Sequence, residues 1–231
     1  MNFKEGIKAG LPIWLGYIPI AIAYGVLGKA AGLDNSIIIL MSIMVYAGAS
    51  QFIGVNLLAA GIPGVEVILT TFMINIRHMI MSASLAMKIE EHMNLKKRML
   101  VAFGITDETF SLTSVLGENK KLSFSFLIGV NFSAYLSWVV GSMIGIAFSQ
   151  MIPSNLSASM GIALYAMFVA LLVPSIRKSK TIFVVSVLAA VFHTVIVYGL
   201  NVSNGWTLVT ASIAAALIGT FAFTEESTIE E

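Results

Sequence analysis

The feature of this sequence that most constrains its fold is a series of long apolar runs. Residues 37–60, for example, are mostly apolar and show no regular alternation with polar residues. A membrane-spanning β-strand would alternate apolar and polar positions over about ten residues, whereas a helix needs about 20 mostly apolar residues to cross the hydrocarbon. Because lipid offers the backbone no hydrogen-bond partners, only helices or closed barrels cross a membrane. The pattern therefore favours helices.

The composition excludes a soluble globular protein. Of the 231 residues, 58% are hydrophobic and only 11% are charged, against roughly a quarter charged in soluble domains. The net charge of +1 argues against a nucleic acid as partner, and the lack of cysteine excludes disulfides. We predict an all-α, polytopic integral membrane bundle in a lipid bilayer, with residues 1–231 forming a single transmembrane domain.

Hydropathy predicts seven to eight apolar segments. The longest polar link between them, Lys88 to Arg98, has eleven residues and is too short for a soluble domain. The first segment follows a short charged stretch and exceeds the apolar core of a cleavable signal peptide, so we expect it to be a retained helix. The eight candidate segments are about 9–31, 36–61, 64–87, 99–116, 122–151, 155–175, 181–200 and 205–223.

Positive charge predicts how the segments are oriented. Lysine and arginine gather at the N-terminus and in the links 88–98 and 176–180, and such links normally face the cytoplasm. Eight simple crossings cannot place all three on one side. Either one of the first three segments enters and leaves the membrane on the same side, or the charge rule has an exception here and all eight segments cross.

A weak internal repeat suggests that segment two is the one that enters and leaves the membrane on the same side. Residues 41–47 resemble residues 160–166, and the same offset of 119 residues roughly superimposes residues 9–87 on 122–200. If segments two and six are discontinuous, the two triplets of segments are inverted relative to each other, as in many secondary transporters. Gly48-Ala49-Ser50 is the expected break in segment two. In this arrangement the link from Glu118 to Lys121 falls outside, against the charge rule.

Charged residues lie at the centres of segments three and four. Arg77 and His78 are near the middle of one, and Asp107 and Glu108 are near the middle of the other. An arginine at the bilayer centre costs about 2.5–3.5 kcal/mol on insertion scales, so a partner is expected. We predict that Arg77 pairs with Asp107, either as a packing clamp or for handling substrate or ions. The second carboxylate, Glu108, then remains for a proton relay or cation site, or faces a water-filled vestibule without a specific role.

Polar residues recur on single faces of these segments. Thr71, Asn75, His78 and Ser82 share one face of segment three, and Asp107, Ser111 and Ser114 share one of segment four. Such stripes predict either a lined cavity or hydrogen bonds between helices. His193 is interpreted as a hydrogen-bonded core residue.

The stretch from Tyr46 to Gln51 also has two interpretations. Its small residues either let two helices pack closely or mark a helix break whose backbone groups bind a zwitterionic solute. The predicted substrate-binding residues are Tyr46, Ser50, Gln51, Asn75 and His78, and the predicted coupling or charge-pair residues are Arg77, Asp107 and Glu108.

These residues resemble the motifs of AzlC-type proteins, the large subunits of bacterial branched-chain amino acid exporters. The similar stretches are residues 46–52, 75–78 and 106–110, together with the Gly-Leu-Pro and Gly-Tyr-Ile-Pro stretches of the first segment. The resemblance implies export of valine, leucine and isoleucine, with methionine or analogues as further candidates, across the bacterial cytoplasmic membrane. It also implies a small hydrophobic partner subunit of the AzlD type. No Walker A motif is present, so we expect secondary coupling without a cofactor.

Other functions remain alternatives from sequence. A related permease could move another small amphipathic solute in either direction, and a structural or receptor subunit is a further option. An intramembrane hydrolase would need a nucleophile and base such as Ser50 with His78 or His193. The sequence lacks the Gly-x-Ser-x-Gly and His-Glu-x-x-His motifs of hydrolases. We therefore expect no enzyme activity.

Overall fold

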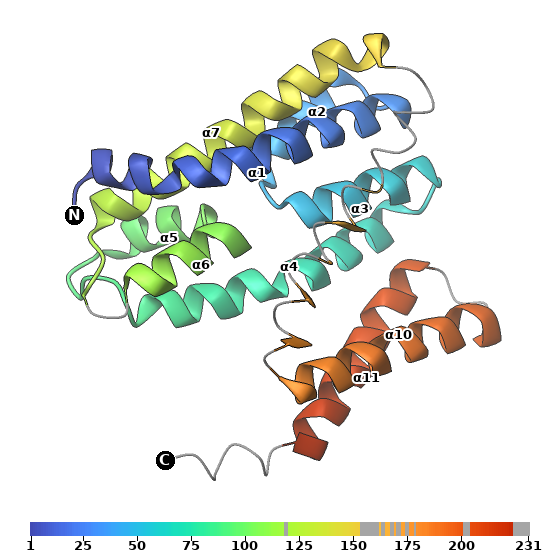
Figure 1. Cartoon of the computed structure of the whole chain (residues 1–231). Helices are drawn as coiled ribbons and strands as arrows, with labels where there is room; N and C mark the ends of the chain where they lie inside the picture. The colour runs from blue at the N-terminus through green and yellow to red at the C-terminus, as the bar shows by residue number, and fades with distance from the viewer. Residues whose placement is uncertain are drawn as a thin grey trace.

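The computed structural model of the protein describes residues 1–117, 120–152, 179–200 and 204–223, with isolated positions between 162 and 177. The described residues form helices joined by short turns (Figure 1), and the all-α prediction is confirmed. The helices are α1 (Phe3–Ala30), α2 (Asn35–Met44), α3 (Gly48–Ala59), α4 (Gly64–Ala86), α5 (Leu95–Phe103), α6 (Asp107–Leu116), α7 (Phe124–Phe148), α10 (Lys180–Leu200) and α11 (Asn204–Phe223), with a 3-10 turn at Ser149–Met151.

Four of the described helices are long and apolar enough to cross a membrane. They are α1, α4, α7 with its 3-10 extension, and α10. Because such runs have no place in a soluble core of this size, the chain is a multi-pass membrane protein. The C-terminal helices α10 and α11 pack against each other, and α11 also contacts α4.

Helices α1 and α7 lie side by side and run in the same direction (Figure 1). Near their start a Cβ on Gly6 would collide with the backbone of α7, and one on Gly129 would collide with the backbone of α1. Farther along, Trp14 Nε1 donates to Ser133 Oγ at 2.9 Å. Small residues allow this close approach, since helix association in lipid depends on packing.

Segment two is discontinuous, as predicted, and forms a hairpin of α2 and α3. The helix is interrupted at residues 45–47, just before the predicted Gly48–Ser50 stretch, where Tyr46 takes a positive φ of 44°. Gln51 Nε2 then donates to Ser42 Oγ at 3.3 Å, so α3 returns antiparallel to α2. We call α2 and α3 the first hairpin. It enters and leaves at the end of the molecule where α1 finishes, because Ile38 packs against Gly28.

Segment four is also discontinuous, which corrects its prediction as one continuous helix. It consists of α5 and α6, interrupted at residues 104–106, and we call this pair the second hairpin. The physical reason is local. Thr106 caps α6 by accepting from the Thr109 N–H, and Thr109 Oγ1 accepts from the Thr106 N–H in return, which starts a new helix. Lys88 Nζ donates to Ser114 O at 2.9 Å, so α6 returns to the end where α4 finishes.

This second hairpin changes the predicted topology. Because the second hairpin does not cross the membrane, α7 starts at the end of the molecule that holds the N-terminus. Two hydrogen bonds show this: Ser123 Oγ donates to Met1 O, and Lys121 Nζ donates to Met87 O at 2.8 Å. Segments one and five are therefore parallel and not inverted, and Lys121 lies at the same end as the N-terminus and the 88–98 link. Segment six and residues 160–166 fall mainly outside the described residues, so the 9–87/122–200 repeat stays a prediction.

The described helices show a different inverted relation. Helix α1 leads into the first hairpin from one end, and α4 leads into the second hairpin from the other end (Figure 1). The N-terminus and the 88–98 link do lie together, as the charge rule predicts. We call this the cationic end; it carries Lys4, Lys8, Lys88, Lys96, Lys97, Arg98, Lys120 and Lys121, against the acids Glu5, Glu90 and Glu91. The positive-inside rule orients it toward the cytoplasm.

Cysteine labelling tests this topology. We expect cysteines introduced at Asn94 and Lys120 to be shielded from impermeant thiol reagents in intact cells, because both flank the second hairpin on the cytoplasmic side. A cysteine at Ala60, between the first hairpin and α4, should be labelled. Opposite accessibility of the Asn94 and Lys120 positions would show that segment four crosses the membrane.

Candidate functional site

The interruptions of the two hairpins meet in one small pocket. It lies between α1, α4, α7 and the two hairpins, and we call it the midplane pocket because it is formed at the middle of the long helices. Its lining residues are Tyr17, Tyr46, Ala47, Gly48, Ala49, Arg77, His78, Thr106, Asp107, Glu108 and Trp138.

An ion pair joins α4 to the second hairpin. Arg77 Nη1 lies 3.0 Å from Asp107 Oδ2, and the two side chains are 30% and 23% exposed. Asp107 is the first residue of α6, where the helix dipole also favours a negative charge. The predicted pair is thus present in the structure. Arg77 Nε is buried without a hydrogen-bond partner among the described residues.

Glu108 is held by α1. The Tyr17 hydroxyl lies 2.6 Å from Glu108 Oε2 and 2.6 Å from Thr106 Oγ1, so it can donate to the carboxylate and accept from the threonine. Glu108 is next to Asp107 in the first turn of α6 but does not share its partner. The Glu108 carboxylate therefore lies at the pocket and is bonded to Tyr17 rather than to Arg77.

Tyr46 stands where the first hairpin is interrupted. Its side chain is 3% exposed, and its hydroxyl has no hydrogen-bond partner among the described residues. The helix that follows, α3, has no side-chain cap at its N-terminus, so the N–H groups of its first turn have no intrahelical partner. Gly48 and Ala49 of that turn line the pocket. Unpaired donors and the positive helix end therefore face the same space.

The residues of the polar stripe predicted on α4 do not line one common cavity. His78 lines the midplane pocket, whereas Ser82 lines a different cavity. Thr71 Oγ1 donates to its own helix at Val67 O, 2.8 Å away. Asn75 Oδ1 is buried without a hydrogen-bond partner among the described residues, although Asn75 is not among the residues lining the pocket.

Ser50 and Gln51 do not line the pocket. Ser50 Oγ donates to Ala47 O at 2.9 Å rather than to a histidine. Gln51 Oε1 accepts from Trp138 Nε1 at 2.9 Å, and Gln51 Nε2 donates to Ser42 Oγ. Both ends of the amide are therefore used to hold the first hairpin against α7. Direct contact of these two residues with a solute stays a prediction, and this geometry does not favour it.

Three lining residues were not predicted from sequence. Tyr17, Thr106 and Trp138 come from α1, the tip of the second hairpin and α7. Tyr17 and Thr106 lie inside the stretches that carry the family resemblance, so a signal was present for them. Trp138 lies in an apolar run of α7, where nothing in the sequence distinguishes it from a core residue.

The midplane pocket is small. It encloses about 20 Å³ of free space, which is room for about one water molecule. A larger solute can enter only if one of the hairpins moves. Each hairpin reaches the pocket from a different end of the molecule.

Comparisons with known proteins identify the family. The family described as AzlC protein matches residues 12–152, which include both hairpins and α7. The chain belongs to the AzlC family. Relatives in this family are named as membrane proteins, and one is named as a transport protein. No solved structure matches this chain significantly.

Three relatives show what this chain is similar to. The inner membrane protein YgaZ of Escherichia coli is 34% identical over 87% of this chain and 84% of its own length. The branched-chain amino acid transport protein AzlC of Bacillus subtilis is 27% identical over 77% of this chain and 69% of its own length. An uncharacterized membrane protein of Archaeoglobus fulgidus is 29% identical over 94% of this chain and 92% of its own length.

Proposed function

We propose that this chain is the large subunit of a secondary transporter that exports the branched-chain amino acids valine, leucine and isoleucine across the bacterial cytoplasmic membrane, with methionine or analogues as further candidate substrates. The observation that carries the proposal is the midplane pocket, where two hairpins from opposite ends place helix interruptions and charged groups together. The name of the Bacillus subtilis relative supports the substrate class.

The pocket contains complementary groups for a zwitterion. A substrate carboxylate would bind the first-turn N–H groups of α3 and the Tyr46 hydroxyl, with Arg77 Nε close by, because all three have unused donors. The ammonium group would lie toward Glu108. Trp138 offers an apolar wall for the branched side chain. Asn75 and His78 on α4 would complete the polar side once the pocket has widened.

Movement of the hairpins provides alternating access. In the described state the interrupted tips of both hairpins line the midplane pocket, and the free space of about 20 Å³ is too small for an amino acid. Outward movement of the second hairpin would open the pocket toward the cationic, cytoplasmic end. Movement of the first hairpin would open it toward the other end. Discontinuous helices at the bilayer centre commonly serve this role in secondary transporters.

A small AzlD-type subunit is the proposed partner. The support is the family resemblance, together with an apolar face of α4 that the described residues leave uncovered. That face includes Val65, Ile68 and Ile80, which are 71%, 67% and 67% exposed. Lipid alone would also accept such a face, so co-purification of the two chains after co-expression in one cell tests the partnership.

Substitutions at unpaired polar groups test the binding site. We expect Tyr46→Phe and Asn75→Ala to weaken leucine binding by roughly five- to a hundredfold, because each removes a partner from a desolvated substrate atom at about 1–3 kcal/mol. The melting temperature should change little, since neither the Tyr46 hydroxyl nor Asn75 Oδ1 has a hydrogen-bond partner among the described residues. Tyr198→Phe on the exposed face of α10 is the matched control.

Binding and melting temperature should be measured on the same purified variants. Lower melting temperatures with unchanged affinity would place the substrate elsewhere. The function itself is tested by efflux of labelled valine from proteoliposomes, with and without the small subunit. Efflux of another amphipathic solute but not valine would identify a permease of different specificity.

A further inference from the structure

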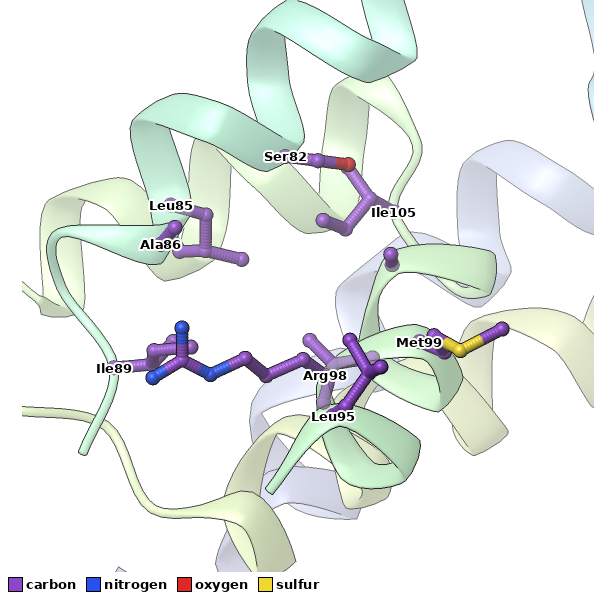
Figure 2. Close-up of a pocket in the computed structure, with 10 residues that line it drawn as sticks. Ser82, Leu85, Ala86, Ile89, Leu95, Arg98, Met99 and Ile105 are labelled. Atoms are coloured by element: carbon purple, nitrogen blue, oxygen red, sulfur yellow. The ribbon is translucent and has the colours of Figure 1, made fainter. Parts of the chain in front are cut away.

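A second cavity lies between the end of α4 and α5, at the cytoplasmic side of the midplane pocket. We call it the α4–α5 crevice. It has a volume of about 220 Å³. Figure 2 shows its lining residues, which are Ser82, Leu85, Ala86, Ile89, Leu95, Arg98, Met99, Val101, Ala102 and Ile105. Apart from Ser82 and Arg98 these residues are apolar, and the transport function proposed above uses none of them.

The crevice exists because of how the second hairpin packs. Helix α6 lies against α4, whereas α5 lies against α7, so α4 and α5 are left apart. The floor is formed by buried side chains such as Leu85, Val101 and Ile105. Its rim includes Leu95 and Met99, which are 72% and 64% exposed. An apolar rim of this kind suits contact with lipid better than contact with water.

Arg98 gives the crevice one charged end. Its Nε donates to Met93 O at 2.9 Å, and its Nη2 donates to the backbone carbonyl of Glu91 at 3.2 Å. These bonds hold the side chain along one edge of the cavity, toward Ile89, as Figure 2 shows. Nη1 has no hydrogen-bond partner among the described residues. Lys96 and Lys97 precede Arg98 at the cationic end of the molecule.

We infer that the crevice binds an anionic phospholipid of the cytoplasmic leaflet, with an acyl chain along α4 and the phosphate at Arg98. Charge complementarity supports this occupant, because basic residues beside membrane helices at the cytoplasmic surface attract anionic head groups. The crevice follows α4 from Ser82 to its last residue, Ala86, over about 6 Å at 1.5 Å per residue, and continues past the helix end to Ile89, so it can hold part of an acyl chain.

An amino acid substrate fits the crevice less well. Its ammonium group would need an acceptor of negative charge, and the lining residues include no carboxylate. A lipid needs only an apolar channel and one anion-binding group, and both are present. The inner end of the crevice is Ile105, next to Thr106 at the tip of the second hairpin. A bound acyl chain would therefore brace the hairpin that opens toward the cytoplasm.

Native mass spectrometry of the purified full-length protein tests the site. Protein exchanged into mixed micelles with phosphatidylglycerol should retain at least one lipid more strongly than with phosphatidylcholine. We expect Arg98→Gln to remove this preference and Ala102→Phe, which fills the crevice, to reduce retention of both lipids. The matched controls are Lys4→Gln at the same end of the molecule and Leu15→Phe, on a membrane-facing side chain that is 83% exposed.

The unmodified protein supplies a second readout in case a variant fails to fold. Phosphatidylglycerol, but not phosphatidylcholine, should raise its melting temperature. Equal retention and equal melting temperatures with both lipids would overturn the inference. So would retention that Ala102→Phe leaves unchanged, or lipid that is displaced when leucine or a small partner subunit is added.

Discussion

Replacing Arg77 by alanine is expected to abolish transport and to lower the free energy of unfolding by about 3 kcal/mol. The change leaves Asp107 without its partner, and breaking a buried ion pair typically costs about 3–5 kcal/mol. We take the lower value because the two side chains are 30% and 23% exposed. Transport fails because the second hairpin loses its link to α4 and the pocket loses its cation.

The double variant Arg77→Ala/Asp107→Ala separates stability from function. Removing both charges leaves no carboxylate unpaired, so stability should return toward that of the parent protein while transport stays absent. Thermal unfolding in detergent and valine efflux from proteoliposomes measure the two effects. Arg177→Ala, on an exposed side chain, is the control. A double variant as unstable as Arg77→Ala would mean that the arginine stabilises the fold by packing alone.

Replacing Glu108 by glutamine is expected to remove most of the dependence of efflux on a proton gradient. The amide has nearly the same shape as the carboxylic acid and can still accept from the Tyr17 hydroxyl, so the protein should assemble normally. It cannot exchange a proton. An intramembrane carboxylate beside a substrate pocket is a common proton carrier in transporters, and the second carboxylate of α6 is available because Asp107 already pairs with Arg77.

The measurement compares efflux with exchange. Gradient-driven efflux in the Glu108→Gln variant should become nearly independent of pH, while exchange of labelled for unlabelled leucine should persist. Glu90→Gln, on an exposed side chain of the 88–98 link, is the control. A parental pH profile in Glu108→Gln would exclude this residue as the proton carrier.

The order of apolar and charged residues along the chain is enough to predict that this protein lies in lipid, that it is helical, and that its buried charges lie near the bilayer centre. Apolar runs of about 20 residues have no stable arrangement except as helices in lipid, and the spacing along segments three and four puts Arg77 and Asp107 at one level. The discontinuity of segment two was also predictable, since small and polar residues interrupt its apolar run. The family motifs contain Tyr17 and Thr106, although neither was predicted to line the pocket.

Which segments cross the membrane depends on contacts that exist only in the folded protein. Segment four has the length and hydropathy of a crossing helix, but the capping of α6 by Thr106 turns it into a hairpin, and this reverses the direction of α7. The orientation of the Gln51 side chain likewise depends on Trp138, whose Nε1 donates to Gln51 Oε1 although the two residues are distant in sequence. Hydropathy is a property of each residue and sets depth in the bilayer. The direction of each helix, the pairing of side chains and the lining of the pocket depend on contacts between residues that are distant in sequence, and no local pattern contains these contacts.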